Sequence, residues 1–147
     1  MRYTILFSIF LFAILSGCKK NKFESKPSLK FKSVSTTVLP TGSLIQFTLS
    51  FTDAEGDLAS SMYVEKIEPS CTFSNFNEMD SIPSFPTSKN EQGDITVTFG
   101  NNYSDPAYSN ISAQCDRNDT AVFRFAISDK ANHTSDTVSS PPIIILH

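Results

Sequence analysis

The sequence predicts an all-β domain, an immunoglobulin-like antiparallel β-sandwich of about seven strands. Three observations predict it. Several runs alternate apolar and polar residues with the period of two that a half-buried strand requires. The body of the chain carries no helical period, and it is rich in the strand-favouring residues Phe, Ile, Val and Thr. With 147 residues, 39% of them hydrophobic, the chain is long enough for one core. The alternative fold is a small barrel.

The first three strands are predicted over 29–39, 43–52 and 62–68. The second run has the clearest alternation, with one face formed by Ile45, Phe47, Leu49 and Phe51. In the first run the apolar positions slip by one residue near Ser33, which predicts a bulge or a strand that changes sheet. The third run is the weakest of the three.

The remaining strands are predicted as a weak strand near 82–85 and strands over 94–100, 120–128 and 136–146. The last run contains Pro141-Pro142, which must interrupt the ladder and requires a sheet edge or a crossover there. The stretch 69–93 is rich in Ser, Asn and Pro. It is expected to form a long connection with one short edge strand.

The first twenty residues are predicted to be a targeting signal. A positively charged start is followed by an apolar run over 4–15, which is shorter than a transmembrane helix needs. The next tetrad, Leu15-Ser16-Gly17-Cys18, resembles the lipobox of bacterial lipoproteins. The resemblance implies that the signal is cleaved before Cys18 and that this cysteine carries acyl chains such as palmitate. An uncleaved N-terminal anchor with a free thiol is the alternative.

The domain organisation follows from this signal. We expect a signal peptide over 1–17, a lysine-rich tether over 18–28 and the sandwich over 29–147. Six lysines and one acid lie between residues 19 and 32, whereas the chain from residue 53 onward has fourteen acids and five bases. A net charge of −3 excludes a global nucleic-acid surface. The basic segment is either a solvated tether or a contact with anionic lipid headgroups.

Cys71 and Cys115 are the two cysteines that remain after lipidation. An even number of cysteines in an exported chain predicts one disulfide. In the sandwich, the end of the strand before Cys71 and the start of the strand after Cys115 lie at the same end of the molecule. Two free buried thiols are the alternative.

An acidic loop follows the strand that ends near residue 52. Asp53, Glu55 and Asp57 alternate with small residues, and Asp129 and Asn132 follow the strand over 120–128. Both loops lie at one end of an immunoglobulin-like sandwich, so these oxygens could converge on a calcium ion. The alternative is that the aspartates only hold tight turns through their own backbone.

The two loop sequences FTDAEGDL and SDKANHTS resemble features of small Bacteroidota outer-membrane lipoproteins with immunoglobulin-like or cadherin-like domains. In cadherins, acids of the corresponding loops bind calcium at domain junctions. The sequence departs from the cadherin pattern, because we expect no second domain and find no full acidic linker motif, so calcium at a domain junction is not expected. Because the first strand starts at the acidic end, we expect the lysine tether to enter beside these acids.

Three tripeptides match the Asp-Ser/Thr-aliphatic pattern that Bacteroidota use for O-glycosylation of exported proteins. The resemblance implies acceptor hydroxyls at Ser81, Thr120 and Thr137. Coincidence is the alternative, because a three-residue pattern carries little information.

The sequence contains no recognisable nucleophile–base set, phosphate loop or glycosidase cleft, and Trp is absent. We therefore expect no enzyme, but a lipid-anchored binding or structural module of the cell envelope with an envelope protein or glycan as its partner. The residues after Cys18 are Lys-Lys-Asn-Lys rather than an acidic export tag, which favours the periplasmic face of the outer membrane. The alternative is a glycan-binding lipoprotein of a polysaccharide-uptake system, with Tyr63, Tyr103 and Tyr108 as its platform.

Overall fold

The computed structural model describes residues 24–58, 61–86 and 88–147. The predicted signal peptide, the predicted lipidation site Cys18 and the first part of the predicted tether lie outside the described residues. The described residues form nine strands and one 3-10 turn, η2 (Thr72–Ser74). The strands are β1 (Ser28–Val34), β2 (Val38–Leu39), β3 (Ser43–Asp53), β4 (Ser61–Ile67), β5 (Phe76–Ser81), β6 (Glu91–Asn101), β7 (Asp119–Ser128), β8 (Val138–Ser139) and β9 (Ile143–Ile145).

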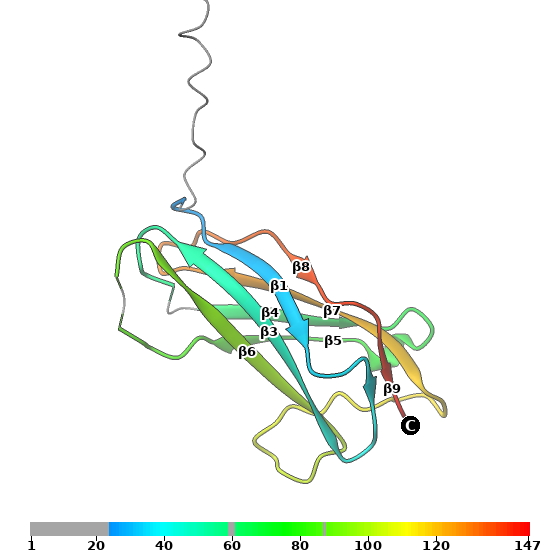
Figure 1. Ribbon diagram of the computed structural model, residues 1–147. Coiled ribbons are helices and arrows are strands. Elements are labelled where there is room, and N and C mark those ends of the chain that lie inside the picture. Colours follow the sequence, from blue (N-terminus) through cyan, green and yellow to red (C-terminus); the bar gives the residue numbers. More distant parts are fainter. Residues whose placement is uncertain (1–23, 59–60, 87) are drawn as a thin grey trace, which may run out of the picture.

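The strands form two sheets that face each other, as Figure 1 shows. One sheet has the order β1-β3-β6, and the other has the order β2-β9-β7-β4-β5, with β8 paired to β7. All pairs are antiparallel except β2 with β9. This is the predicted immunoglobulin-like sandwich, and the two separate sheets exclude the barrel alternative.

The predicted strand 29–39 is divided between the two sheets. Its register against β3 shifts between Phe31 and Ser33, at the position where the alternation slips. After Val34 the chain crosses over, and β2 pairs with β9 in the opposite sheet. Both expectations for this segment, a bulge and a change of sheet, are confirmed.

The predicted weak strand over 82–85 is wrong. The short edge strand is β5, which lies earlier and pairs with β4. Pro83 and Pro86 lack the N–H groups that a ladder needs, so the segment after β5 runs on as loop while Ile82 is buried in the core. At the C-terminus the two prolines separate β8 from β9, as predicted.

The core is built around Phe47, which is fully buried between the sheets. Its ring lies 4.8 Å from Phe123, 5.3 Å from Phe125 and 6.3 Å from Phe99, measured between centroids. Alternate residues of β3 point inward in step with Phe47. Because this alternation continues to the end of the strand, it also buries Asp53, and so it positions the first residue of the acidic loop.

Candidate metal centre

Asp53 organises the loop that follows β3. Its side chain has no exposed surface, and its Oδ2 accepts the backbone N–H of Gly56 at 2.6 Å and of Asp57 at 3.2 Å. Gly56 has φ +73°, and a Cβ there would lie 2.4 Å from the carbonyl oxygen of Ser88. The turn interpretation of this loop is therefore supported by hydrogen bonds. Only one of the two Asp53 oxygens is used in it.

The structure brings Asp53, Asp57 and Asp129 together. One carboxylate oxygen from each lies within 4.8 Å of the others, and Asp53 and Asp129 are fully buried. Oδ1 of Asp53 and Oδ1 of Asp57 are buried and have no hydrogen-bond partner among the described residues. Oxygens that share a Ca²⁺ ion, each about 2.3–2.6 Å from it, are separated by at most about 5 Å. The spacing and the free oxygens therefore suit a hard divalent cation.

His133 is a member of this region that the sequence analysis did not identify. Its Nδ1 lies 2.9 Å from Oδ2 of Asp129, and its backbone N–H donates to Oδ1 of Asp129 at 2.8 Å. The Asp129 N–H in turn donates to the His133 carbonyl at 3.1 Å. Glu55, Asp129 and His133 form a second group whose ligand atoms lie within 4.8 Å of one another. The sequence signal that could have identified His133 is its position four residues after Asp129, which directly follows a predicted strand.

Two predicted ligands occupy the margin of the cluster. Glu55 is exposed and belongs to the second group with His133 rather than to the buried trio. Asn132 is exposed with φ 68°, and its backbone N–H donates to the carbonyl of Asp129 at 3.2 Å. Among the described residues, no hydrogen bond links the Asn132 side chain to the carboxylates. Asn132 therefore shapes the loop through its backbone.

The carboxylates at this end repel one another. Desolvation raises the pKa of Asp57, and the charges of Asp129, Asp53 and Glu55 raise it further. Burial also raises the pKa of Glu91, with a further contribution from Asp53. Glu91 lies opposite Asp53 in the β3–β6 ladder, and no residue in the described part of the chain makes a hydrogen bond with its buried Oε2. Neutralisation of this charge, by protons or a cation, is therefore favourable.

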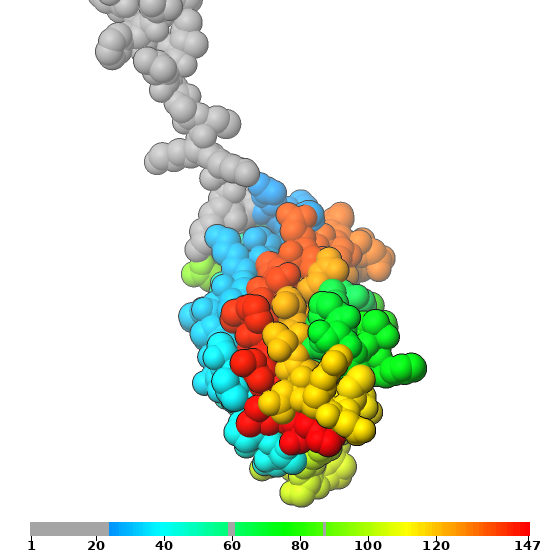
Figure 2. All heavy atoms as spheres, turned by 90° about the vertical axis from the view of Figure 1, so that its right-hand side faces the viewer, coloured from blue at the N-terminus to red at the C-terminus, as the bar shows by residue number. Residues whose placement is uncertain are grey.

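The chain enters the sandwich at this same end, which confirms the expected position of the tether. The backbone N–H of Ala54 donates to the carbonyl of Glu24 at 3.3 Å. Lys26 pairs with Asp136 at 2.6 Å, and this hydrogen bond and charge lower the pKa of Asp136. Figures 1 and 2 show the first described residues, in blue, beside the orange segment that follows β7. We call this the tether end.

The opposite end carries the predicted disulfide. Cys71 and Cys115 are bonded, with their Cα atoms 6.2 Å apart, so the free-thiol alternative is excluded. In Figure 2 the yellow segment before β7 lies against the green segment that contains η2. The disulfide closes loops far from the acidic cluster, so the two ends of the sandwich have different chemistry.

The three predicted glycan acceptors are all exposed. Ser81 ends β5, and Thr137 lies just before β8. Thr120 lies within β7, opposite Ile144, and the Asp119 of its tripeptide is buried. Their modification stays a prediction, and the match at Thr120 has a separate structural explanation in the burial of Asp119.

The structure brings together two of the three tyrosines. Tyr103 and Tyr108 make an edge-to-face contact with centroids 5.8 Å apart and planes at 74°. Tyr63 lies in β4, between Met79 of β5 and Ala126 of β7. Among the described residues, the ring contacts join Tyr103 to Tyr108, and the three-ring platform of the glycan-binding alternative stays a prediction.

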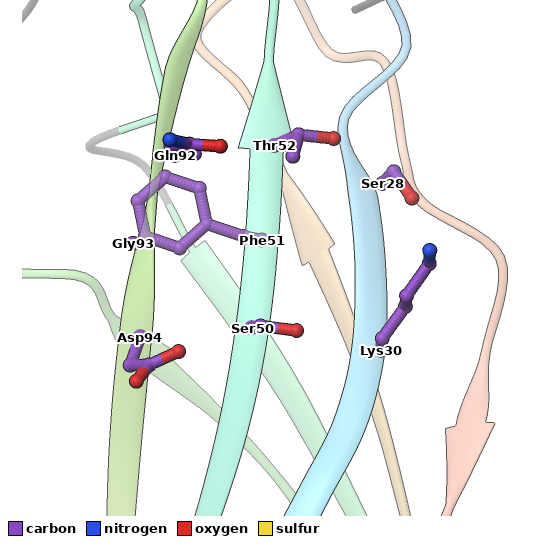
Figure 3. A pocket seen from close by; sticks show the side chains of 8 residues that line it. All are labelled: Ser28, Lys30, Ser50, Phe51, Thr52, Gln92, Gly93 and Asp94. Carbon is purple, nitrogen blue, oxygen red and sulfur yellow. The ribbon is translucent and has the colours of Figure 1, made fainter. Parts of the chain in front are cut away.

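A hollow on the β1-β3-β6 sheet is lined mostly by polar residues. Figure 3 shows the ring of Phe51 over Gly93, where a Cβ would lie 2.9 Å from a ring carbon. The Lys30 ammonium and the Asp94 carboxylate lie along the opposite margins of the hollow. The remaining lining residues are Ser28, Ser50, Thr52 and Gln92. The grouped metal-ligating side chains lie outside this hollow.

Fold and site together define a β-sandwich domain with a carboxylate cluster at the end where its chain enters. No protein-family model matches the chain, and no curated protein matches it. The search of solved structures matched the chain to Spo0M, a sporulation control protein from Bacillus subtilis, at 8% identity and a TM-score of 0.48. The match covers 84% of this chain and 51% of that protein, so the chain spans about half its length. Among the described residues, no helix has the length and apolarity to cross a membrane.

Proposed function

We propose that this chain is a lipid-anchored, non-catalytic module of the cell envelope that binds or supports another envelope component, at the periplasmic face of the outer membrane. The observation that carries the proposal is the entry of the chain at the tether end, where Glu24 contacts Ala54. Glu24 is six residue steps along the chain from Cys18, and an extended chain spans at most about 3.3–3.6 Å per step, so this segment reaches roughly 20 Å at most. A lipid on Cys18 therefore orients the acidic cluster toward the membrane and the disulfide end away from it.

The same proposal includes a calcium ion at Asp53, Asp57 and Asp129. Carboxylates held close to anionic headgroups are repelled by them, and a divalent cation removes that repulsion. The support is geometric, because the buried Oδ1 atoms of Asp53 and Asp57 have no hydrogen-bond partner in the described contacts. Oδ2 of Asp53 can keep its turn while Oδ1 binds the ion.

Replacing Cys18 by Ala tests the anchor. The wild-type chain is expected to incorporate labelled palmitate and to fractionate with the outer membrane, because two acyl chains anchor a protein stably. The Cys18→Ala variant is expected to carry no label, to keep its signal segment and to be lost from the outer-membrane fraction. Palmitate label on that variant, or an unchanged amount of it in the outer-membrane fraction, would contradict the proposal. Protection of the wild type from protease added to whole cells is the expected result for the periplasmic face, and its digestion would place the module outside.

Replacing Asp57 by Asn tests the calcium site, because the variant is expected to be more stable than the wild type in chelator and less stable than the wild type in calcium. Because the pKa of Asp57 is raised in the folded state, its ionised form costs stability at neutral pH, and this cost disappears as the pH falls through the folded pKa. In chelator at pH 7, Asp57→Asn is therefore expected to melt slightly above the wild type. In calcium at a hundred times Kd, the wild type gains about 2.7 kcal/mol and the variant gains almost nothing.

The matched control for this experiment is Asp116→Asn, an exposed acid at the disulfide end. It should leave both the melting temperature in chelator and the calcium response unchanged. The absence of a calcium-dependent shift in the wild type at millimolar calcium would remove the metal site. An equal shift in Asp57→Asn would place any calcium elsewhere.

A further inference from the structure

A charged cluster lies buried at the disulfide end of the sandwich. The side chains of Lys66 and Asp119 are both 0% exposed, and Glu68 is 1% exposed. Lys66 follows Met62 and Val64 on the inward face of β4, and Asp119 begins the inward series of β7. These positions would normally hold apolar residues, because an isolated buried charge is costly. The cluster is remote from the carboxylates of the tether end and has no part in the proposed function.

The Lys66 ammonium nitrogen lies directly against the Asp119 carboxyl group. Nζ is 3.3 Å from Oδ2 of Asp119, and it donates to Oγ of Ser74 at 2.5 Å and to the carbonyl of Ile111 at 3.1 Å. The Ser74 hydroxyl donates to the same Oδ2 of Asp119. A hydrogen-bonded path therefore runs from Nζ through Ser74 Oγ to Oδ2.

A simple ion pair leaves this cluster incompletely satisfied. Oδ1 of Asp119 and Oε2 of Glu68 are buried without a hydrogen-bond partner among the described residues. Removing two charges from water costs several kcal/mol per ion, which a single contact repays only with good geometry. A neutral covalent link between the two side chains would remove one positive and one negative charge from the core.

We propose that Lys66 and Asp119 are joined by an isopeptide bond that forms after folding. The neutral amine attacks Cγ of Asp119, the Nζ–Cγ bond forms, and the bond from Cγ to Oδ2 breaks. One proton from Nζ passes through Ser74 to Oδ2, which leaves with the carboxylic-acid proton as one water molecule. Oδ1 becomes the amide carbonyl oxygen. The reaction is a dehydration, so it requires neither an oxidant nor another co-reactant.

The site supplies the conditions that this reaction needs. Burial lowers the pKa of Lys66, which favours the neutral amine, while Asp119 and Glu68 act in the opposite direction. As a neutral amine, Nζ keeps two N–H groups for Ser74 and Ile111 and can direct its lone pair at Asp119. When two reacting groups are held about 3–3.5 Å apart in the right orientation, the reaction between them proceeds as if one group were present at about 10⁵–10⁸ M. Ser74 is therefore a positioning and proton-relay residue.

Peptide mapping of the purified, folded chain tests the proposal. The protein is reduced, alkylated, denatured and digested with trypsin. Trypsin does not cleave after an acylated lysine, so we expect residues 33–89 joined to residues 118–124, with a mass lower than the sum of the two peptides by one water molecule. Recovery of linear 33–66, 67–89 and 118–124 at their calculated masses would overturn the proposal.

The chain offers an internal control and two variants. Lys32 and Asp94 lie 2.5 Å apart but both are about half exposed, so their peptides should stay unlinked. Lys66→Arg should yield only linear peptides, because a guanidinium does not form this amide. Ser74→Ala should slow the appearance of the linked peptide during refolding at least several-fold. If Lys66→Arg does not fold, the wild-type digest still decides, independently of lipidation and calcium.

Discussion

Replacing Phe47 by Ala is expected to lower the free energy of unfolding by about 3–5 kcal/mol, a large part of the 5–15 kcal/mol typical of a domain. Phe47 has no exposed surface and contacts the rings of Phe99, Phe123 and Phe125 from both sheets. Truncation leaves a cavity between sheets whose backbone ladders resist collapse. Urea denaturation of the oxidised protein, followed by circular dichroism, measures the loss.

The matched control is the same substitution at Phe73, which is 89% exposed in η2. Phe73→Ala removes the same atoms from water rather than from the core, and it should change the free energy of unfolding by less than about 0.5 kcal/mol. Equal losses at the two positions would contradict the assignment of Phe47 to the centre of the core.

Removing the disulfide is the second change with a large expected effect. Cys71 and Cys115 are 44 residues apart, and closing a loop of that length in the unfolded chain is worth about 4 kcal/mol in the chain-entropy model. The double variant Cys71→Ser, Cys115→Ser should therefore lose up to that amount. The isopeptide bond proposed above spans the same loop, so the loss should be smaller in a chain that carries it.

Reduction of the wild type provides the control for that variant. The two samples should unfold at the same urea concentration, because both lack the same cross-link. An unchanged midpoint in both would contradict a stabilising role of the disulfide. A lower midpoint in the variant alone would instead point to the buried hydroxyl that Ser introduces at Cys71, a position only 3% exposed.

The sequence predicted most of the fold because the relevant signals are local. The alternation of apolar and polar residues in β3, β6 and β7 indicates which residues face the core. Pro141-Pro142 indicates where the pairing of the C-terminal strand is interrupted. The edge strand was misplaced to 82–85 because β5 alternates only weakly and is mostly exposed. A strand whose partners supply its stability leaves little pattern in its own sequence.

The candidate site was predicted in part, because local sequence patterns also show where the strands that carry it end. Asp53, Asp57 and Asp129 follow strands whose ends meet in any immunoglobulin-like sandwich, so topology alone brought them together. His133 was missed because its role depends on a loop that folds back onto Asp129. Lys66 was missed because a lysine in a strand is normally a solvent-facing residue, and only the packing of η2 and Ile111 around it encloses the ammonium.

The sequence by itself determined the class of fold and the order of the main strands, since periodicity is a local property, and it predicted a disulfide that the bonded Cys71 and Cys115 confirm. It also determined that the acids and the basic segment are separated along the chain. Only the tertiary structure decided which sheet each half of the first strand joins, which oxygens lie unpartnered at the tether end and that Lys66 meets Asp119. Those features depend on distances between residues remote in sequence, and only packing sets such distances.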